Sequence, residues 1–260
     1  MKEKLTIVKV GGAVVEDEAQ LARLLKDFAA IEGHKILVHG GGRRATKVAG
    51  ALGIESRMVD GRRITDAKML EVVTMVYGGL VNKSLVARLQ ACGINALGLT
   101  GADMNAVQSH KRPLKNSIDF GFVGDVDHVN GYALQLLLQQ GITPVMAPLT
   151  HDGQGNILNT NADTMASEMA KALSRFFNVT LIYCFEKPGV LRNPADETSL
   201  IPVITREEFS GYVADGTVSG GMIPKLENAL AAVDHGVSKV IITLATAIDG
   251  KHGTVIQRRK

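Results

Sequence analysis

The chain has 260 residues, of which 45% are hydrophobic and 21% charged, and its formal net charge is +3. This length and composition allow a packed core in one large or two smaller domains. Aromatic residues make up only 4% of the chain and tryptophan is absent, which disfavours platforms for stacking single-stranded nucleic acid. Much of the positive charge lies in Lys251 and in 258–260. Such a run is typical of a solvated tail, so no nucleic-acid partner is expected.

The cysteines and histidines do not form a metal-binding pattern. Cys92 and Cys184 are far apart and belong to no C-x-x-C motif, which is typical of buried thiols in a reducing compartment. The histidines show no H-E-x-x-H spacing, so no metal centre built from protein ligands is expected. No segment approaches the ~20 apolar residues of a membrane span, and no signal-like stretch develops at the N-terminus. We therefore interpret the chain as a cytoplasmic protein without a membrane partner.

Short apolar strands alternate with longer amphipathic helices along the chain. The sequence predicts strands at 5–10, 35–38, 95–99, 143–147, 179–184 and 239–244, and helices at 18–31, 44–52, 66–91, 133–140, 162–175 and 224–235. The segment 107–127 is expected to form a β-hairpin. Regular alternation of strands and helices predicts a layered α/β fold around a mainly parallel sheet. A soft domain boundary is expected near residue 176.

Four short motifs carry the functional prediction, namely Lys9 to Gly12, Gly40 to Gly42, Asn159 to Asp163 and Gly220 to Lys225. The first two place glycines directly after apolar strands, where the backbone can approach a ligand and offer bare N–H groups. The first and last place a lysine beside glycines, as a compact charge for phosphate oxygens. Together they favour transfer of a phosphoryl group between two anions, because positioning and charge neutralisation supply most of that catalysis.

Each motif also has an interpretation without function. Either glycine cluster alone is compatible with a tight packing turn, and Asp163 at a predicted helix start is compatible with a helix cap. Lys225 is harder to explain structurally, because a cation at a helix start opposes the helix dipole and a phosphate ligand accounts for it. Arg62 and Arg63 are compatible with solvated charge or with a bidentate carboxylate clamp.

A dinucleotide-binding site is a rival interpretation. The segment from Gly40 to Ala45 follows a strand, opens a helix and fits G-x-G-x-x-G/A, and Asp60 lies where a ribose-binding acid is expected. The chain would then be an NAD-dependent dehydrogenase, but a nicotinamide site has no use for Lys9 in the first glycine turn. The P-loop motif and the H-R-D motif of protein kinases are absent from the sequence. Phosphoryl transfer would therefore need another scaffold.

The motifs, taken in order, resemble those of the N-acetylglutamate kinases in the amino-acid kinase superfamily. K-x-G-G, V-H-G-G-G, G-x-R-x-T, N-x-N-A-D and a glycine-Met-x-x-K segment follow one another between Thr6 and Ile256. The resemblance implies a three-layer αβα sandwich with a mainly parallel, roughly eight-stranded central sheet. It implies an acylglutamate-binding lobe at 1–175 that forms a homodimer and a nucleotide-binding lobe at 176–260. The implied activity is ATP-dependent phosphorylation of the γ-carboxylate of N-acetyl-L-glutamate in arginine biosynthesis.

The resemblance also implies roles for single residues. Lys9 and Lys225 would neutralise the migrating phosphoryl group, and Asp163 would orient both lysines rather than act as a base. Phosphate oxygens would contact Gly11, Gly12, Gly41 and Gly42. The acylglutamate would contact Gly41, Arg63 and Asn159, with Arg62 beside them. The nucleotide would contact Glu186, Gly189, Gly221, Met222 and Lys225. Mg²⁺ would bridge the ATP phosphates, held mainly by nucleotide oxygens and water rather than by protein ligands.

Two positions depart from the family pattern. The turn that usually contacts the nucleotide is here Phe185 to Val190. It keeps its acid as Glu186, but Phe185 and Lys187 are unusual. Arg62 stands where leucine commonly precedes the carboxylate-binding arginine. An additional cation there could accept a second carboxylate, so N-succinylglutamate is an alternative substrate.

Two further expectations concern assembly and activity. Arginine-inhibited hexamers of this family carry an extra helix before the first strand, whereas only Met1 to Lys4 precede it here. A dimer insensitive to arginine is therefore expected. A catalytically idle amino-acid sensor is an alternative from another class, but a sensor would not need Lys9, Asp163 and Lys225 together.

Overall fold

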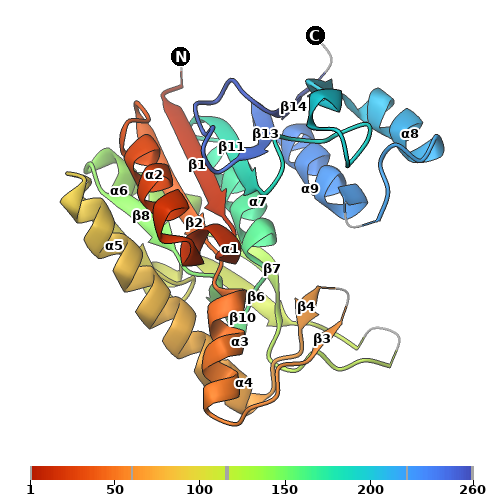
Figure 1. Ribbon diagram of the computed structural model, residues 1–260. Coiled ribbons are helices and arrows are strands. Elements are labelled where there is room, and N and C mark those ends of the chain that lie inside the picture. The colour runs from red at the N-terminus through yellow and green to blue at the C-terminus, as the bar shows by residue number, and fades with distance from the viewer. Residues whose placement is uncertain (1, 60, 115–116, 221, 259–260) are drawn as a thin grey trace.

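The computed structural model describes residues 2–59, 61–114, 117–220 and 222–258. These residues form three layers, in which one main sheet lies between two layers of helices (Figure 1). The sheet has eight strands in the order β12-β14-β13-β11-β1-β2-β8-β5. In that order the strands are Val203–Ile204, Thr254–Ile256, Lys239–Leu244, Asn178–Phe185, Lys4–Val10, His34–His39, Thr143–Met146 and Ala96–Leu99. Every neighbouring pair is parallel except β13 with β14. The predicted mainly parallel, eight-stranded αβα sandwich is confirmed.

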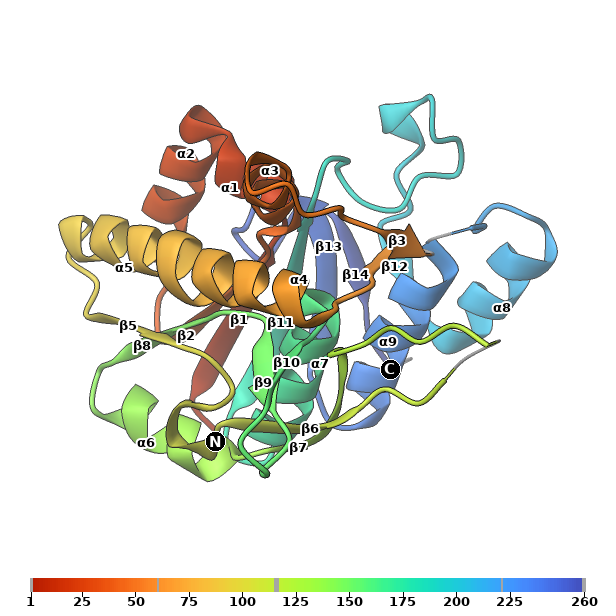
Figure 2. The same cartoon turned by 90° about the horizontal axis from the view of Figure 1, so that it is seen from below.

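Helices cover both faces of this sheet. One face carries α6 (Gly131–Gln139), α7 (Ala162–Leu173) and α9 (Met222–Asp234). The other carries α1 (Gly12–Glu16), α2 (Glu18–Ala29), α3 (Gly42–Ala51), α4 (Ala67–Val73) and α5 (Asn82–Ala91), with a π-helical segment, η1 (Thr74–Val81), joining the last two. Figure 2 shows the two helical layers from below.

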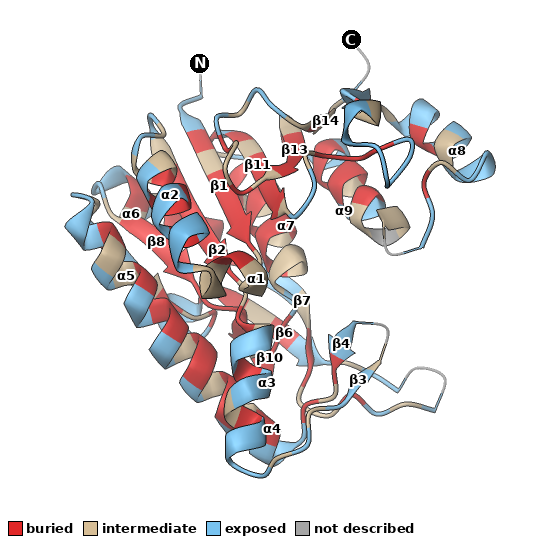
Figure 3. Ribbon diagram, viewed as in Figure 1, coloured by how far each residue is buried: buried red, intermediate tan, exposed pale blue. Residues whose placement is uncertain are grey.

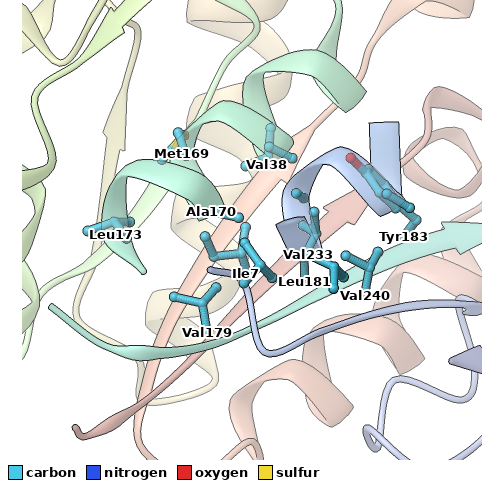
Figure 4. Close-up of a cluster of buried hydrophobic side chains, with 14 of the residues drawn as sticks. Ile7, Val38, Met169, Ala170, Leu173, Val179, Leu181, Tyr183, Val233 and Val240 are labelled. Atoms are coloured by element: carbon cyan, nitrogen blue, oxygen red, sulfur yellow. The ribbon is translucent and has the colours of Figure 1, made fainter. Parts of the chain in front are cut away.

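The core is split by the sheet into two clusters, one beneath each helical layer. Figure 4 shows the first cluster, in which Ile7 and Leu181 of the sheet face Ala170 of α7. In the second cluster Val8 and Leu37 pack toward α1 to α5. The central strands are therefore buried on both faces (Figure 3), which explains why they occur in the sequence as nearly continuous apolar runs.

A smaller, mixed sheet lies beyond one end of the main sheet. Its order is β10-β9-β6-β7, with strands Ile157–Asn159, Leu149–His151, Val107–Lys111 and Gly124–Val129. The antiparallel pair β6–β7 is the predicted hairpin. A two-stranded ribbon, β3 (Met58–Val59) with β4 (Arg62–Arg63), stands beside it. The sequence interpretation missed this ribbon, β9, β10, β12, β14 and helix α8 (Arg206–Ala214), which packs on α9.

The helix over 67–91 is unusually long and apolar. Among the described residues, Ala67–Ala91 is one helix whose length and composition would allow it to cross a membrane. Its inward side chains, including Met69, Val72 and Leu85, belong to the core. A core helix of a globular fold passes the same test, so this helix is explained by packing.

Candidate active site

The carboxyl ends of β11, β1 and β2 lie side by side at one edge of the sheet. Lys9 on β1 is opposite Tyr183 on β11 and Val38 on β2. The segments that follow these three strands therefore meet at the same level, as the carboxyl ends of neighbouring parallel strands do. Two of these segments are the predicted phosphate-binding glycine turns.

The two glycine turns touch each other. The Gly40 N–H donates to the Val10 carbonyl over 2.8 Å. A Cβ atom on Gly12 would lie only 3.4 Å from the backbone nitrogen of Gly42 and 3.5 Å from that of Gly41. A Cβ on Gly11 would lie 3.9 Å from the Lys9 ammonium. Glycine at these positions therefore keeps backbone nitrogen atoms and the ammonium within reach of one small anion.

Asp163 faces Lys9 in the first turn of α7. The cap of this helix is Asn161, whose side chain accepts hydrogen bonds from Asp163 N over 2.8 Å and Thr164 N over 3.0 Å. Asp163 is therefore not needed as a cap, and its Oδ1 lies 2.8 Å from Lys9 Nζ. The Tyr183 hydroxyl donates to the Asp163 carbonyl over 3.0 Å and fixes the start of the helix.

Lys225 enters the same space from α9, near the other end of the chain. Its ammonium lies 4.1 Å from the centroid of the Phe185 ring, a cation–π distance. Burial is the main cause that lowers the pKa of Lys225. Asp163 and Glu186 act to raise this pKa and Lys9 acts to lower it. Lys225 thus shares one electrostatic environment with Lys9 and Asp163. The sequence interpretation treated Phe185 only as a departure and missed it as the ring beneath this lysine.

A cavity of about 170 Å³ adjoins these groups. Its lining combines the second glycine turn, the β3–β4 ribbon and the approach to α7, and consists of Gly40, Gly41, Gly42, Met58, Gly61, Arg62, Arg63, Tyr77, Arg112, Val123, Pro148, Asn159, Thr160, Asn161 and Ala162. The predicted acylglutamate-binding residues Gly41, Arg62, Arg63 and Asn159 are therefore brought together.

Arg63 is fixed in the wall of this cavity. Its Nη2 donates to the Gly42 carbonyl and to Thr46 Oγ1, each over 2.9 Å, and its Nη1 donates to the Ser56 hydroxyl. The residue is only 7% exposed, so its charge is directed at the cavity rather than at solvent. A buried guanidinium with a fixed plane is suited to a planar carboxylate.

Asn159, Arg62 and Arg112 complete the polar lining. Asn159, at the end of β10, is buried and donates through Nδ2 to Thr65 Oγ1 over 3.0 Å. Arg62 is exposed and lines the cavity from β4. Arg112 pairs with Asp125 and stacks on the Phe120 ring. Arg112 was missed from the sequence, where no motif distinguishes it within the predicted hairpin.

Tyr77 supports the second glycine turn from η1. A Cβ on Gly41 would lie 2.8 Å from Tyr77 Cδ1, and a Cβ on Gly42 would lie 3.9 Å from the Tyr77 hydroxyl. The π-helical segment that carries this tyrosine is thus next to the site, as π-bulges often are. The sequence interpretation treated the region as a regular apolar helix and missed this contact.

The predicted nucleotide contacts are less uniform. Glu186 lies beyond β11 near Lys225, and its Oε1 is 3.2 Å from Arg43 Nη2. Gly189 is buried, and a Cβ there would lie 2.6 Å from Leu200 Cδ1 and from Thr254 Oγ1, so packing alone accounts for this glycine. Met222 begins α9 and packs partly on the core. Gly221 lies outside the described residues, as does Asp60 of the dehydrogenase interpretation.

His39 stabilises the second glycine turn from beneath. It is fully buried, and burial lowers its pKa to about 4. Its Nδ1 lies 2.8 Å from the Gly40 carbonyl, so Nδ1 carries the proton. Nε2 then accepts from Asn82 Nδ2 over 3.2 Å, while the same amide donates to the Val145 carbonyl. The neutral imidazole therefore connects the second glycine turn to Asn82 at the start of α5, and through the Asn82 amide to β8.

We expect this histidine to make the fold sensitive to acid. The pKa of an unfolded histidine is about 6.5, above the folded value of about 4. The unfolded chain therefore binds the extra proton first. The stabilisation is complete above about pH 6.5 and is lost as the pH falls toward 4, by about 3 kcal/mol in total. Urea unfolding of the wild type and His39→Gln at several pH values should show this slope only in the wild type. Equal slopes in both would contradict the prediction.

Two glycine turns, two lysines and a carboxylate gathered at the strand ends of an αβα sandwich are compatible with a kinase that has no P-loop. The model of the Amino acid kinase family matches residues 4–244, and the chain belongs to this family. The resemblance predicted from the motifs is confirmed.

Relatives that match over nearly the full chain show which members of this family the chain is similar to. The chain is 66% identical over 258 residues to the acetylglutamate kinase of Bacteroides thetaiotaomicron, with 99% of this chain and 100% of that protein covered. It is 56% identical over 246 residues to the acetylglutamate kinase of Cytophaga hutchinsonii, with 95% and 93% covered. Among solved structures, smu.665 from Streptococcus mutans is 26% identical with a TM-score of 0.78, covering 98% of this chain and 99% of that one. These findings favour a kinase over the dehydrogenase interpretation.

Proposed function

We propose that this chain phosphorylates the γ-carboxylate of N-acetyl-L-glutamate with ATP and releases N-acetylglutamyl 5-phosphate and ADP, a step of arginine biosynthesis. One observation carries the proposal: the Lys9–Asp163 ion pair and Lys225 share a space bounded by two glycine turns, next to a cavity lined by buried Arg63. The full-length relatives named acetylglutamate kinase support it.

The chemistry follows from the charges. The γ-carboxylate is already ionised at neutral pH and needs no general base. Its oxygen forms a bond to the γ-phosphorus while the bond from that phosphorus to the bridging oxygen of ADP breaks. Lys9 and Lys225 neutralise charge spreading over the phosphoryl oxygens, and the glycine turns donate N–H groups to them. Asp163 holds the ammonium of Lys9 in place. Arg63 and Asn159 would bind the α-carboxylate of the acylglutamate.

The nucleotide would bring Mg²⁺ with it. Within the described ranges, no group of three or more His, Cys, Asp or Glu side chains gathers as a metal site. We infer from the family resemblance that the ion would be held mainly by nucleotide oxygens and water, while Asp163 orients the lysines. When bound, Mg²⁺ would neutralise negative charge on the β- and γ-phosphates.

Trapping the acyl phosphate with hydroxylamine tests the reaction. The enzyme with ATP, Mg²⁺ and N-acetylglutamate should yield the hydroxamate, and omission of ATP should abolish it. N-succinylglutamate serves as the comparison substrate, because Arg62 beside the cavity suggested it as an alternative. We expect a higher kcat/KM for the acetyl substrate. If neither N-acetylglutamate nor N-succinylglutamate gave the hydroxamate, the proposed function would be refuted and the idle sensor favoured.

We also propose the two lobes and the homodimer. The acylglutamate-binding lobe at 1–175 and the nucleotide-binding lobe at 176–260 would meet between α7 and β11, and the main sheet continues across that boundary. For the dimer, β5 is an edge strand, and α5 lies against it through the Lys83–Gly98 hydrogen bond. Exposed Leu97 of β5 and exposed Met75 and Leu80 of η1 supply apolar surface for a second copy.

Light scattering tests this assembly. We expect the wild type to have the mass of a dimer and Leu80→Glu to be a monomer, because a charge would be buried without a partner. Val213→Glu, at an exposed apolar residue of α8, is the matched control and should remain dimeric. A hexameric wild type, or a dimer unaffected by Leu80→Glu, would contradict the proposal.

A further inference from the structure

Arg43 and Glu186 form an ion pair that the mechanism above does not use. Arg43 is the second residue of α3, directly after the second glycine turn, and Glu186 directly follows β11. The distance from Arg43 Nη2 to Glu186 Oε1 is 3.2 Å. Both side chains are largely exposed, at 63% and 72%.

The position of this pair relative to the sheet is informative. β1 lies between β11 and β2 in the strand order, and the pair joins the segment after β11 to the segment after β2. It therefore spans the carboxyl end of β1, where Lys9 and the first glycine turn lie. The backbone nitrogen of Arg43 is 3.7 Å from the Cβ position of Gly12. The backbone of Arg43 is thus next to the space assigned to the phosphates, and Glu186 is close enough to Lys225 to act on its pKa.

The balance of charge gives the pair a function. Lys9, Lys225 and Arg43 place three cations around this space, while Asp163 and Glu186 supply two carboxylates. Both Glu186 and Asp163 act on the pKa of Lys225. When ATP binds, its phosphates neutralise the cations, and the carboxylate of Glu186 is no longer needed for that purpose. A guanidinium such as that of Arg43 can bind phosphate oxygens in bidentate fashion. An exposed ion pair contributes little to stability, so Arg43 can exchange its partner at small cost.

We propose that Arg43 binds the phosphates of ATP, and that Glu186 holds its guanidinium over the phosphate site while the nucleotide is absent. This inference rests on the proposed function and adds a third cation to the site. It also gives Glu186 a role in the empty enzyme, separate from any contact with the nucleoside. The opposing explanation is a structural strut, in which the ion pair joins two segments and neither residue meets the nucleotide.

The two explanations predict different effects of Glu186→Gln on phosphate binding. If Arg43 binds phosphate, Arg43→Gln should raise the KM for ATP about ten- to hundredfold, the range for a charge-assisted hydrogen bond, and leave the KM for N-acetylglutamate unchanged. Glu186→Gln removes the competitor and should not weaken phosphate binding. Under the strut explanation, both variants would change the enzyme in the same direction, because each breaks the same pair.

Tripolyphosphate with Mg²⁺ is the most direct probe, because it lacks ribose and base. Its inhibition constant against ATP should rise at least about tenfold in Arg43→Gln and fall up to about fivefold in Glu186→Gln, the scale of one exposed ion pair. The double variant should match Arg43→Gln. Arg44→Gln, at an exposed arginine on the same turn of α3, is the control for lost charge and should behave as wild type.

The results separate this inference from the proposed function. Unchanged inhibition in Arg43→Gln, equal weakening in Arg43→Gln and Glu186→Gln, or equal weakening in Arg44→Gln would each overturn the role of Arg43. Formation of hydroxamate by the wild type would still support the kinase in all three cases. Loss of hydroxamate in the wild type itself would instead refute the proposed function.

Discussion

Lys225→Ala is expected to lower kcat by at least ~10²-fold, the scale for loss of one preorganised electrostatic donor. The ammonium lies over the Phe185 ring and shares its environment with Lys9 and Asp163, so its loss removes one of the positive charges directed at the migrating phosphoryl group. Because Arg63 and Asn159 are untouched, the KM for N-acetylglutamate should stay close to the wild-type value. Steady-state kinetics with both substrates varied will separate these effects.

Lys47→Ala is the matched control for this variant. Lys47 is an exposed lysine of α3 that pairs with Glu16 over 2.7 Å and has no assigned role in the site. Its removal should leave kcat within about twofold of wild type, as for most surface substitutions. A kcat for Lys225→Ala that matches this control would remove Lys225 from the mechanism. Circular dichroism melting of both variants will check that neither loss is due to unfolding.

Much of the fold could be predicted from local patterns. The central strands are buried on both faces and occur as apolar runs, and the larger helices show a regular apolar stripe, so both were found with boundaries close to the observed ones. Helix α8 was missed although its start carries a recognisable capping box, in which Thr205 and Glu208 bond reciprocally to the backbone. The two-residue strands β3, β4 and β12 are too short for a period of alternation to be recognised.

The candidate site was predictable where one motif sufficed. Lys9, Asp163 and Lys225 each stand in a short segment with a glycine turn or helix start, and the structure brings them together. The Arg43–Glu186 pair could not be predicted, because it depends on β1 lying between β11 and β2, a result of tertiary pairing. The contact of Tyr77 with Gly41 depends likewise on a π-helical segment that has no local sequence signature.

Asp163→Asn is expected to lower kcat by about 10²-fold as well, through the lysines it orients. The carboxylate lies 2.8 Å from the Lys9 ammonium, and an amide keeps the shape but not the charge. With that charge gone, the repulsion between Lys9 and Lys225 is less well compensated, because only Glu186 still acts to raise the pKa of Lys225. The effect should not be additive with Lys225→Ala, because residues that act as a unit lose their function together.

The pH profile distinguishes this role from a structural one. Lys225 must carry its proton to bind phosphate, so kcat/KM for ATP falls as the pH rises through the pKa of Lys225. Burial already lowers that pKa, and Asp163 acts to raise it. Asp163→Asn should therefore move the basic limb of the profile to lower pH, while Asp163→Glu, which keeps the charge, should leave it in place. A merely structural aspartate would lower the whole profile without moving its basic limb, so an unshifted limb in Asp163→Asn would contradict the electrostatic role.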